Sequence, residues 1–157
     1  MLKKILIVCL SLMLIVLTGC SGKPSSTENL NDLSLEQIME KVYAGIKEDQ
    51  LPGLMNTPLS QENLNYALGL DALDFKEGLV SEPMMSSIAH SVVIVRVNDG
   101  VDVEKTKADI EANIDPRKWI CVEVNEKDVI VDSKDNVIIL IMVNDLAKDI
   151  HNNFKKL

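Results

Sequence analysis

The sequence predicts a single α+β domain, in which helices pack on a sheet of about four strands, mostly antiparallel or mixed. Three observations support this prediction. Apolar residues recur at helical spacing in several segments, other apolar runs have the length and composition of strands, and the elements follow the order ααβαβββα without an internal repeat. Because 46% of the 157 residues are hydrophobic and only 3% are aromatic, we expect an aliphatic core that contains methionine.

Two helices are predicted at the start of this domain. Ser34 and Gln37 have the spacing of a capping box. A helix over 35–48 follows from the helical spacing of Leu35, Ile38, Met39, Val42 and Ile46. Ser60 repeats the capping pattern, and a shorter helix over 60–69 follows from the spacing of Leu64, Ala67 and Leu68.

The middle of the chain is predicted to contain one interior strand and one helix. Residues 71–85 mix acidic residues, glycine and proline, and we expect irregular structure there. The segment 88–97, IAHSVVIVRV, is apolar on both alternating faces, which is typical of a strand inside a sheet. A helix over 102–114 follows it. Met84 and Met85, just before the strand, are expected to fill gaps in the core.

Three strands and a helix are predicted in the last third of the chain. The strands are WICVEV at 119–124, VIV at 129–131 and VIILIMV at 137–143. The last run is the most apolar of the mature chain and suits a central strand covered on both sides, although a short buried helix has the same pattern. Asn144 is expected to cap a final helix, whose inward residues are Leu146, Ile150, Phe154 and Leu157.

The first twenty residues have the features of a targeting signal. Lys3 and Lys4 form a cationic region, and residues 5–18 form an apolar region. This apolar run of 14 residues is short for a membrane-spanning helix, which needs about 20. It ends in LTGC, which resembles the lipobox of bacterial lipoproteins. The alternative is an ordinary secretory signal, or a short transmembrane segment, with a chance cysteine.

In a lipobox, the cysteine thiol takes a diacylglyceryl group and signal peptidase II then cuts just before the cysteine. The resemblance therefore implies that Cys20 is lipidated and that signal peptidase II recognises Leu17, Thr18 and Gly19. Two acyl chains hold a protein stably on a bilayer, whereas one chain binds only marginally. We therefore expect a protein at the outer face of the cell membrane, with the lipid bilayer as a partner through acylated Cys20.

This interpretation divides the chain into three parts. They are a signal peptide at 1–19, a lipidated N-terminus with a flexible tether at 20–33, and a single α+β domain at 34–157. The signal is expected to form a helix with few contacts to the domain. Nothing in the mature sequence is shaped to receive it.

The charge and the cysteines of the mature chain exclude some classes of function. The formal charge of the whole chain is −8, and removal of residues 1–19, which contain two lysines and no acidic residue, changes it to −10. An acidic domain is repelled by phosphate backbones, so nucleic acid is not an expected partner. Cys9 leaves with the signal and Cys20 is blocked by lipid, so Cys121 has no partner for an intramolecular disulfide.

The candidates for catalysis are few. A nucleophilic cysteine would need a base, and His90 and His151 are the only histidines. Cys121 is expected to be a small apolar residue buried in a strand, and His90 a core or edge residue of an apolar strand. We therefore expect both residues to be structural, and we predict no catalytic residue.

No metal or cofactor site is predicted either. Two histidines and one free thiol do not supply the four ligands of a structural zinc site. Two acidic clusters lack the glycine and the terminal glutamate of an EF-hand: Asp99, Asp102 and Glu104, and Asp132, Asp135 and Asn136. Turn formation and helix capping explain both clusters.

Three stretches of the mature chain are similar to a known family: SEPMMSSIAHSVVIVRV, DPRKWICVEV and VIILIMVNDLAKDIHNNFKKL. They resemble the bacterial lipoproteins grouped as domain of unknown function 4358. The resemblance covers roughly 34–157 and includes the lipobox. It implies a cell-surface lipoprotein of a Gram-positive lineage, and it carries over no catalytic or ligand-binding residue. Some relatives are encoded near membrane-bound O-acyltransferases, which hints at polysaccharide modification.

Two functions are consistent with these observations. The first is a membrane-anchored, extracytoplasmic lipoprotein whose non-catalytic domain binds a protein or polymer of the envelope. The second is an accessory protein or enzyme of cell-envelope polysaccharide modification by acylation, with His90 or Cys121 involved. A concave pocket with either residue beside acids favours the enzyme, whereas a solid core with a flat exposed apolar patch favours binding.

Overall fold

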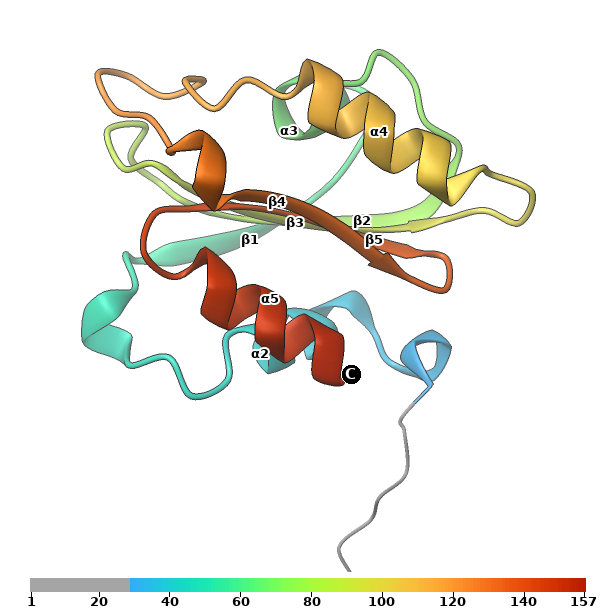
Figure 1. Ribbon diagram of the computed structural model, residues 1–157, viewed down its shortest axis with the longest axis horizontal. Helices are drawn as coiled ribbons and strands as arrows, with labels where there is room; N and C mark the ends of the chain where they lie inside the picture. Colours follow the sequence, from blue (N-terminus) through green and yellow to red (C-terminus); the bar gives the residue numbers. More distant parts are fainter. Residues whose placement is uncertain (1–28) are drawn as a thin grey trace, which may run out of the picture.

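The computed structural model describes residues 29–157, which form a five-stranded antiparallel sheet with helices on both faces (Figure 1). The strand order is β1-β2-β3-β5-β4. The strands are β1 Leu54–Pro58, β2 Phe75–Pro83, β3 His90–Val97, β4 Val129–Lys134 and β5 Val137–Val143. The helices are α2 Leu35–Val42, α3 Leu64–Leu68, α4 Val103–Asn113 and α5 Ala147–Lys156, with short 3-10 turns η1 Leu30–Asp32, η2 Glu48–Gln50 and η3 Glu126–Asp128. The predicted α+β class is confirmed.

The two central strands are the most buried part of the molecule. Every residue of β3 and of β5 is buried, and the two strands pair antiparallel from His90 opposite Val143 to Arg96 opposite Val137. Both were predicted as interior strands from apolar residues on alternating faces, and both predictions are confirmed. The buried helix that the sequence of β5 also allowed does not form.

Each face of the sheet has its own hydrophobic core. One core lies between the sheet and the helices α2 and α5, and the other lies between the sheet and α3, α4 and the long segment after α4 (Figure 1). Leu30 is fully buried in the first core, although the sequence interpretation places it in the tether. The folded domain therefore begins before residue 34. The predicted signal helix and residues 1–28 lie outside the described part of the chain.

The sheet has one strand more than expected, because β1 and β2 were not predicted and the strand predicted at 119–124 does not form. The order of the longer elements is αβαββαββα instead of ααβαβββα. Residues 54–58, LMNTP, contain a proline, and residues 75–83 contain Gly78 and two acidic residues, so neither segment shows the apolar alternation of a strand. Pairing with β3, which is far away in sequence, holds β2 in place.

The strand predicted at 119–124 is wrong. This segment is irregular, and Cys121 within it has a positive φ of 60°. Trp119 and Val124 are buried in the core beside α4, and this burial explains their apolar character. The segment is held by single backbone hydrogen bonds, from the Ile120 N–H to the Ser86 carbonyl and from the Val124 N–H to the Pro116 carbonyl.

The start of the first predicted helix is confirmed, whereas its end is not. The Gln37 N–H donates to the Ser34 hydroxyl, and the Ser34 N–H donates to the Gln37 side chain at 2.9 Å, which completes the capping box. The α2 helix ends at Val42, with Tyr43 as its C-cap, rather than at residue 48. The chain then turns through Gly45, whose φ is +79°.

The starts of the two other helices differ from the prediction. Asn63 rather than Ser60 precedes α3, and the Ser60 N–H donates to the Asn63 side chain. Asn144 does not cap α5, which begins after Leu146. The Asn144 side chain instead accepts from the Asn125 N–H and donates to the Glu123 carbonyl, so it ties the segment before η3 to the end of β5.

Among residues 29–157, no helix has both the length and the apolar character that crossing a bilayer requires.

Candidate functional site

A buried ion pair marks one end of the sheet, on the face covered by α3 and α4. Nζ of Lys118 lies 2.7 Å from Oε1 of Glu82, and only 5% of the Lys118 side chain and 21% of the Glu82 side chain are exposed. Glu82 belongs to β2, and Lys118 comes from the irregular segment between α4 and η3. Ion pairs this deeply buried are uncommon, because each charge loses its hydration.

The surroundings of Lys118 offset part of this loss. Its ammonium group also donates to the Ser91 hydroxyl and to the Tyr66 carbonyl, each at 3.3 Å, and lies 4.3 Å from the centre of the Tyr66 ring. Burial lowers the pKa of Lys118, and the charge of Glu82 and the hydrogen bond to it act in the opposite direction. Lys118 therefore joins β2, β3 and α3 through a single side chain.

A second polar pair lies on the opposite face of the sheet at the same end. The Tyr43 hydroxyl is 2.8 Å from Nε2 of His90, and their rings stack with centroids 5.9 Å apart. Burial lowers the pKa of His90 to about 4, partly opposed by the charge of Glu82. Burial also raises the pKa of Tyr43, while a hydrogen bond with Ser81 acts the other way. The neutral imidazole therefore accepts a hydrogen bond at Nε2 from the Tyr43 hydroxyl, which keeps its proton.

His90 is buried, as predicted for a core residue, whereas Cys121 is not. Cys121 is exposed in the irregular segment and lines a shallow pocket of about 340 Å³ with Arg117, Trp119, Val122 and Glu123. No histidine lines this pocket, and His90 faces the other side of the sheet. The structure therefore does not bring the two candidate residues together. The burial predicted for Cys121 is wrong, because the segment is not a strand.

The other histidine and the acidic clusters have local partners. Nε2 of His151 on α5 lies 2.6 Å from Asp132 on β4, and Asp102 accepts from the Lys105 N–H as the cap of α4. Burial raises the pKa of Asp132, but hydrogen bonds from His151 and from the Ser133 N–H lower it overall. Among the described residues, no three His, Cys, Asp or Glu side chains converge as metal ligands would.

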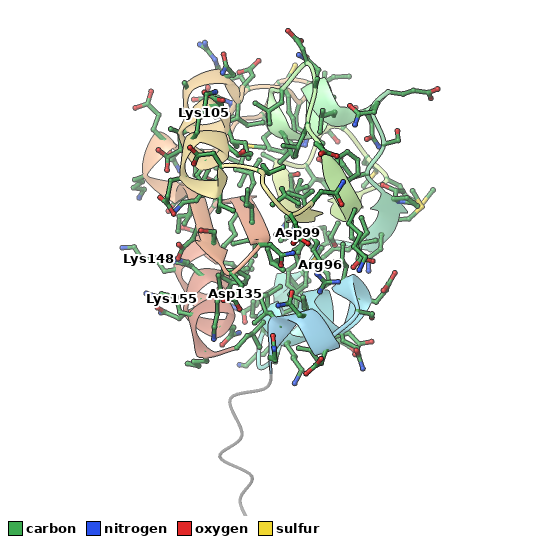
Figure 2. The ribbon with its side chains drawn as sticks, turned by 90° about the vertical axis from the view of Figure 1, so that its right-hand side faces the viewer. Arg96, Asp99, Lys105, Asp135, Lys148 and Lys155 are labelled. Atoms are coloured by element: carbon green, nitrogen blue, oxygen red, sulfur yellow. The ribbon has the colours of Figure 1, made fainter. Side chains whose placement is uncertain are left out.

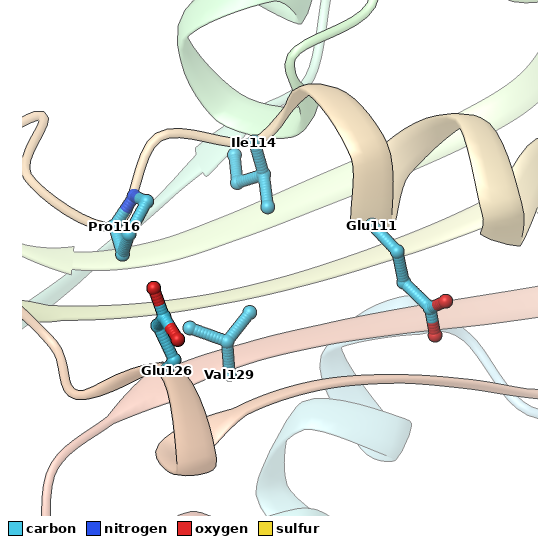
Figure 3. A pocket seen from close by; sticks show the side chains of 5 residues that line it. All are labelled: Glu111, Ile114, Pro116, Glu126 and Val129. Carbon is cyan, nitrogen blue, oxygen red and sulfur yellow. The ribbon is translucent and has the colours of Figure 1, made fainter.

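A further pocket, of about 360 Å³, lies between α4, η3 and β4 (Figure 3). Glu111 and Glu126 line it together with Ile114, Pro116 and Val129. It offers two carboxylates without a nucleophile or a cationic side chain. We therefore assign it no chemistry.

Five large hydrophobic side chains are exposed in the described part of the chain, and they gather around the ion pair. Three of them lie in the loop between β2 and β3 and in the neighbouring segment after α4, and the other two lie on β1 and α3. They are Met84 (81% exposed), Ile120 (64%), Met85 (60%), Met55 (48%) and Tyr66 (47%), and we call them the methionine surface.

Strand pairing, a cation–ring contact and a backbone hydrogen bond connect the residues of this surface. Met55 stands directly opposite Glu82 in the pairing of β1 with β2, and the Tyr66 ring lies against Lys118. The Ile120 N–H donates to Ser86, which follows the two methionines of the loop. The prediction that Met84 and Met85 fill the core is wrong, because the loop carries them into solvent.

Comparisons with family models, curated proteins and solved structures found no match. The resemblance to the family named above therefore stays a prediction. The predicted lipidation residue Cys20 and the predicted recognition residues Leu17, Thr18 and Gly19 lie outside the described part of the chain.

The opposite end of the sheet holds the start of the folded domain. Arg96 on β3 is buried, and its guanidinium donates to the Leu30 carbonyl at 2.9 Å and to the Leu33 carbonyl at 2.8 Å, and pairs with Glu77. Figure 2 looks onto this end, where Arg96 lies near the turns that carry Asp99 and Asp135. Arg96 therefore fixes the place at which residue 29 enters the fold.

The methionine surface and this entry point lie far apart. His90 and Arg96 stand near the two ends of β3, and six residue steps along a strand span about 20 Å. In Figure 1 the loop after β2 and the segment after α4 lie at the left, and η1 lies at the right. The sequence did not reveal this arrangement, because it depends on strands whose pairing the sequence did not predict.

Proposed function

We propose that this protein is a lipid-anchored, extracytoplasmic binding module whose methionine surface contacts a protein of the cell envelope. One observation supports this proposal most directly. All five exposed large hydrophobic side chains of the described residues lie around one ion pair, at the end of the sheet away from the entry of the chain. Scattered exposed apolar residues are ordinary, whereas a gathered set is typical of a contact surface.

The anchor follows from the predicted lipobox. Acylated Cys20 is separated from residue 29 by nine residue steps, and a flexible chain of that length spans about 16 Å on average. Arg96 holds the beginning of the domain near this tether. The methionine surface lies at the other end of the sheet from this attachment point, so the tether does not compete with a partner for it.

The chemistry of the surface suits a protein partner. Methionine side chains are flexible and polarisable, so they adapt to an apolar partner, and Tyr66 adds an aromatic ring beside a cation. The formal charge of −10 after removal of the signal, derived from the sequence, disfavours acidic polymers as partners. Cell-wall polymers rich in phosphate are therefore weaker candidates than a neutral or basic protein.

Crosslinking in intact cells tests this proposal. A photo-crosslinking amino acid at Met84 is expected to capture one defined protein, whereas the same group at Lys155, which is exposed on α5, is expected to capture none. Replacing Met85 and Ile120 by serine in the same chain is expected to remove the crosslink. Equal crosslinking from Met84 and Lys155, or a crosslink unaffected by the serine replacements, contradicts the proposal.

The anchor has its own test. The Cys20→Ala variant is expected to incorporate no labelled fatty acid and to escape cleavage by signal peptidase II, because the acceptor thiol is gone. The Cys9→Ala variant is the matched control, because Cys9 lies inside the signal, and it is expected to be labelled normally. Fatty acid labelling of Cys20→Ala at the level of the unchanged protein contradicts the lipid anchor.

The second candidate is an accessory protein or enzyme of cell-envelope polysaccharide acylation. It is favoured by the exposed Cys121, which shares a pocket with Arg117 and Glu123. If Cys121 accepts an acyl group, a strain in which Cys121→Ala replaces the normal protein is expected to lose envelope acylation. Full complementation by Cys121→Ala, together with full complementation by His90→Gln, removes this candidate.

A further inference from the structure

The outer edge of the sheet at β1 has unpaired backbone groups, and their positions follow from the strand register. The Leu59 N–H donates to the Gly78 carbonyl, so these two residues form a hydrogen-bonded pair. Such pairs alternate along antiparallel strands, so Thr57 and Met55 also direct their backbone groups to β2.

The alternate residues of β1 direct their backbone groups away from β2. The N–H and C=O of Leu54 and of Asn56 and the C=O of Pro58 are directed outwards, away from β2. Within the described part of the chain, no other segment pairs with this side of β1. The Pro58 carbonyl accepts from Nδ2 of Asn63 at 3.1 Å, so the edge offers two free donors and two free acceptors, on Leu54 and Asn56.

The other edge of the sheet, at β4, is protected. The hydrogen bond from the Val97 N–H to the Asn136 carbonyl sets the register, so Ser133 is one of the residues of β4 that point outwards. The Ser133 N–H is taken by the Asp132 carboxylate at 2.8 Å. β4 also carries charged Asp132 and Lys134, as protected edges do, whereas β1 carries no charge.

We propose that the β1 edge binds an extended segment of a protein partner as a sixth, antiparallel strand, and that the segment is uncharged in its centre and basic at its ends. This inference rests on the proposed function and names the way in which the partner is held. Addition of a strand to a sheet edge is a common mode of peptide recognition, in which backbone hydrogen bonds supply affinity. The proposed contact is continuous with the methionine surface, to which Met55 of β1 belongs.

The charge around β1 favours a segment with basic ends. Glu48 and Asp49 are exposed on η2 just before the strand, and Glu62 is exposed just after it. Lys47 is the only basic residue between positions 47 and 62. A lysine or arginine at either end of the added strand therefore meets a carboxylate, while neutral residues face the uncharged strand.

A second copy of this chain fits the edge less well. Two β1 strands pair symmetrically about Asn56, and Leu54 of each copy then faces Pro58 of the other. Because proline has no N–H, the Leu54 carbonyl of each copy stays unpaired in that arrangement. A segment without proline satisfies all four free groups of Leu54 and Asn56. Two copies also repel each other, because each carries a formal charge of −10 after removal of the signal, as derived from the sequence.

Synthetic peptides test the inference on the full-length lipidated protein in detergent micelles. The probe is a fluorescent seven-residue peptide of alternating valine and threonine with a lysine at each end, N-methylated on one edge so that it does not assemble with itself. It is expected to bind and to slow amide hydrogen exchange at Leu54 and Asn56. The same peptide N-methylated on both edges has no free backbone edge and is expected not to bind.

Two variants sharpen the test. Asn56→Pro removes an outward N–H that does not bond β2, so the fold is expected to persist while affinity for the probe falls at least about tenfold. Ser133→Pro makes the corresponding change on the protected edge and is expected to leave the affinity unchanged. A probe with glutamate at both ends is expected to bind at least about tenfold more weakly than the lysine probe.

The outcomes separate this inference from the proposed function. Strand addition is overturned if the lysine probe does not bind. It is also overturned if Asn56→Pro and N-methylation of both edges leave the binding of the probe unchanged. If the crosslink from Met84 persists in that case, the methionine surface still holds a partner by another mode. If the probe binds but the crosslink from Met84 is absent, the proposed function fails and the edge remains a peptide site.

Discussion

The Tyr43 hydroxyl and Nε2 of His90, 2.8 Å apart, join the end of α2 to the start of β3. The two rings also stack, with their planes 19° apart. His90 is only 3% exposed, so a charged imidazole there would lose nearly all its hydration. Burial therefore favours the neutral imidazole at this contact between a helix and the central strand.

The free energy of unfolding is expected to decrease as the pH falls, because of His90. Its pKa is lowered from the usual 6.5 to about 4 in the folded protein. The unfolded chain therefore binds the proton first, so this stabilising contribution is complete above pH 6.5 and is lost as the pH falls towards 4. The full loss of unfolding free energy from protonation of His90 is about 3 kcal/mol. Urea unfolding at pH 7 and pH 4.5 measures it, and a His90→Gln variant with the same pH dependence as the unchanged protein contradicts it.

The Lys118–Glu82 pair is expected to be strongly coupled. Lys118→Met leaves a carboxylate without its partner, and Glu82→Gln leaves a buried ammonium group, so each change is expected to cost about 3 kcal/mol of unfolding free energy. The double variant is expected to lose less unfolding free energy than the sum of the losses in the two single variants. Additive losses in the four-member cycle, measured by chemical denaturation, show that the two groups act independently.

Arg96 is expected to hold the first residues of the domain in place. Arg96→Met leaves the Leu30 and Leu33 carbonyls without their donor, so it is expected to cost about 3 kcal/mol and to speed proteolysis around residue 33. Glu77→Gln is the matched control, because the Glu77 side chain is 41% exposed, and a loss below about 1 kcal/mol is expected. Unchanged protease resistance in Arg96→Met shows that η1 is held by its apolar contacts alone.

Gly69 is expected to tolerate no side chain. Its φ is +71°, and a Cβ atom would lie 2.6 Å from the backbone carbon of Asn113 at the end of α4. Gly69→Ala is therefore expected to cost at least about 2 kcal/mol, from strain and from displacement of α4. Gly53→Ala, where a Cβ meets open space, is expected to change stability by less than about 0.5 kcal/mol. Equal melting temperatures for the two variants contradict this explanation.

Local patterns predicted the elements whose reasons for forming lie close together in the sequence. The capping box at Ser34 needs only Gln37, three residues away, and the apolar runs of β3 and β5 reflect burial on both faces. The segment 119–124 shows the limit of this reasoning. Trp119 and Val124 are apolar because they fill the core from an irregular segment, so composition alone suggested a strand that does not form.

The candidate site could not be predicted in the same way. Lys118 and Glu82 are 36 positions apart, and His90 and Tyr43 are 47 apart, so only the packing of the sheet against its neighbours brings each pair together. The exposure of Met84 was likewise decided by the unpredicted strand β2, which ends just before it and turns it outwards.

The sequence by itself determined the α+β class, the two central strands and the start of the first helix, because these depend on hydrogen bonds and burial patterns within short segments. The tertiary structure alone decided which edge of the sheet is open, where Arg96 holds the entering chain and which side chains surround Lys118. Those features depend on strand register and on contacts between distant segments, which local sequence does not encode.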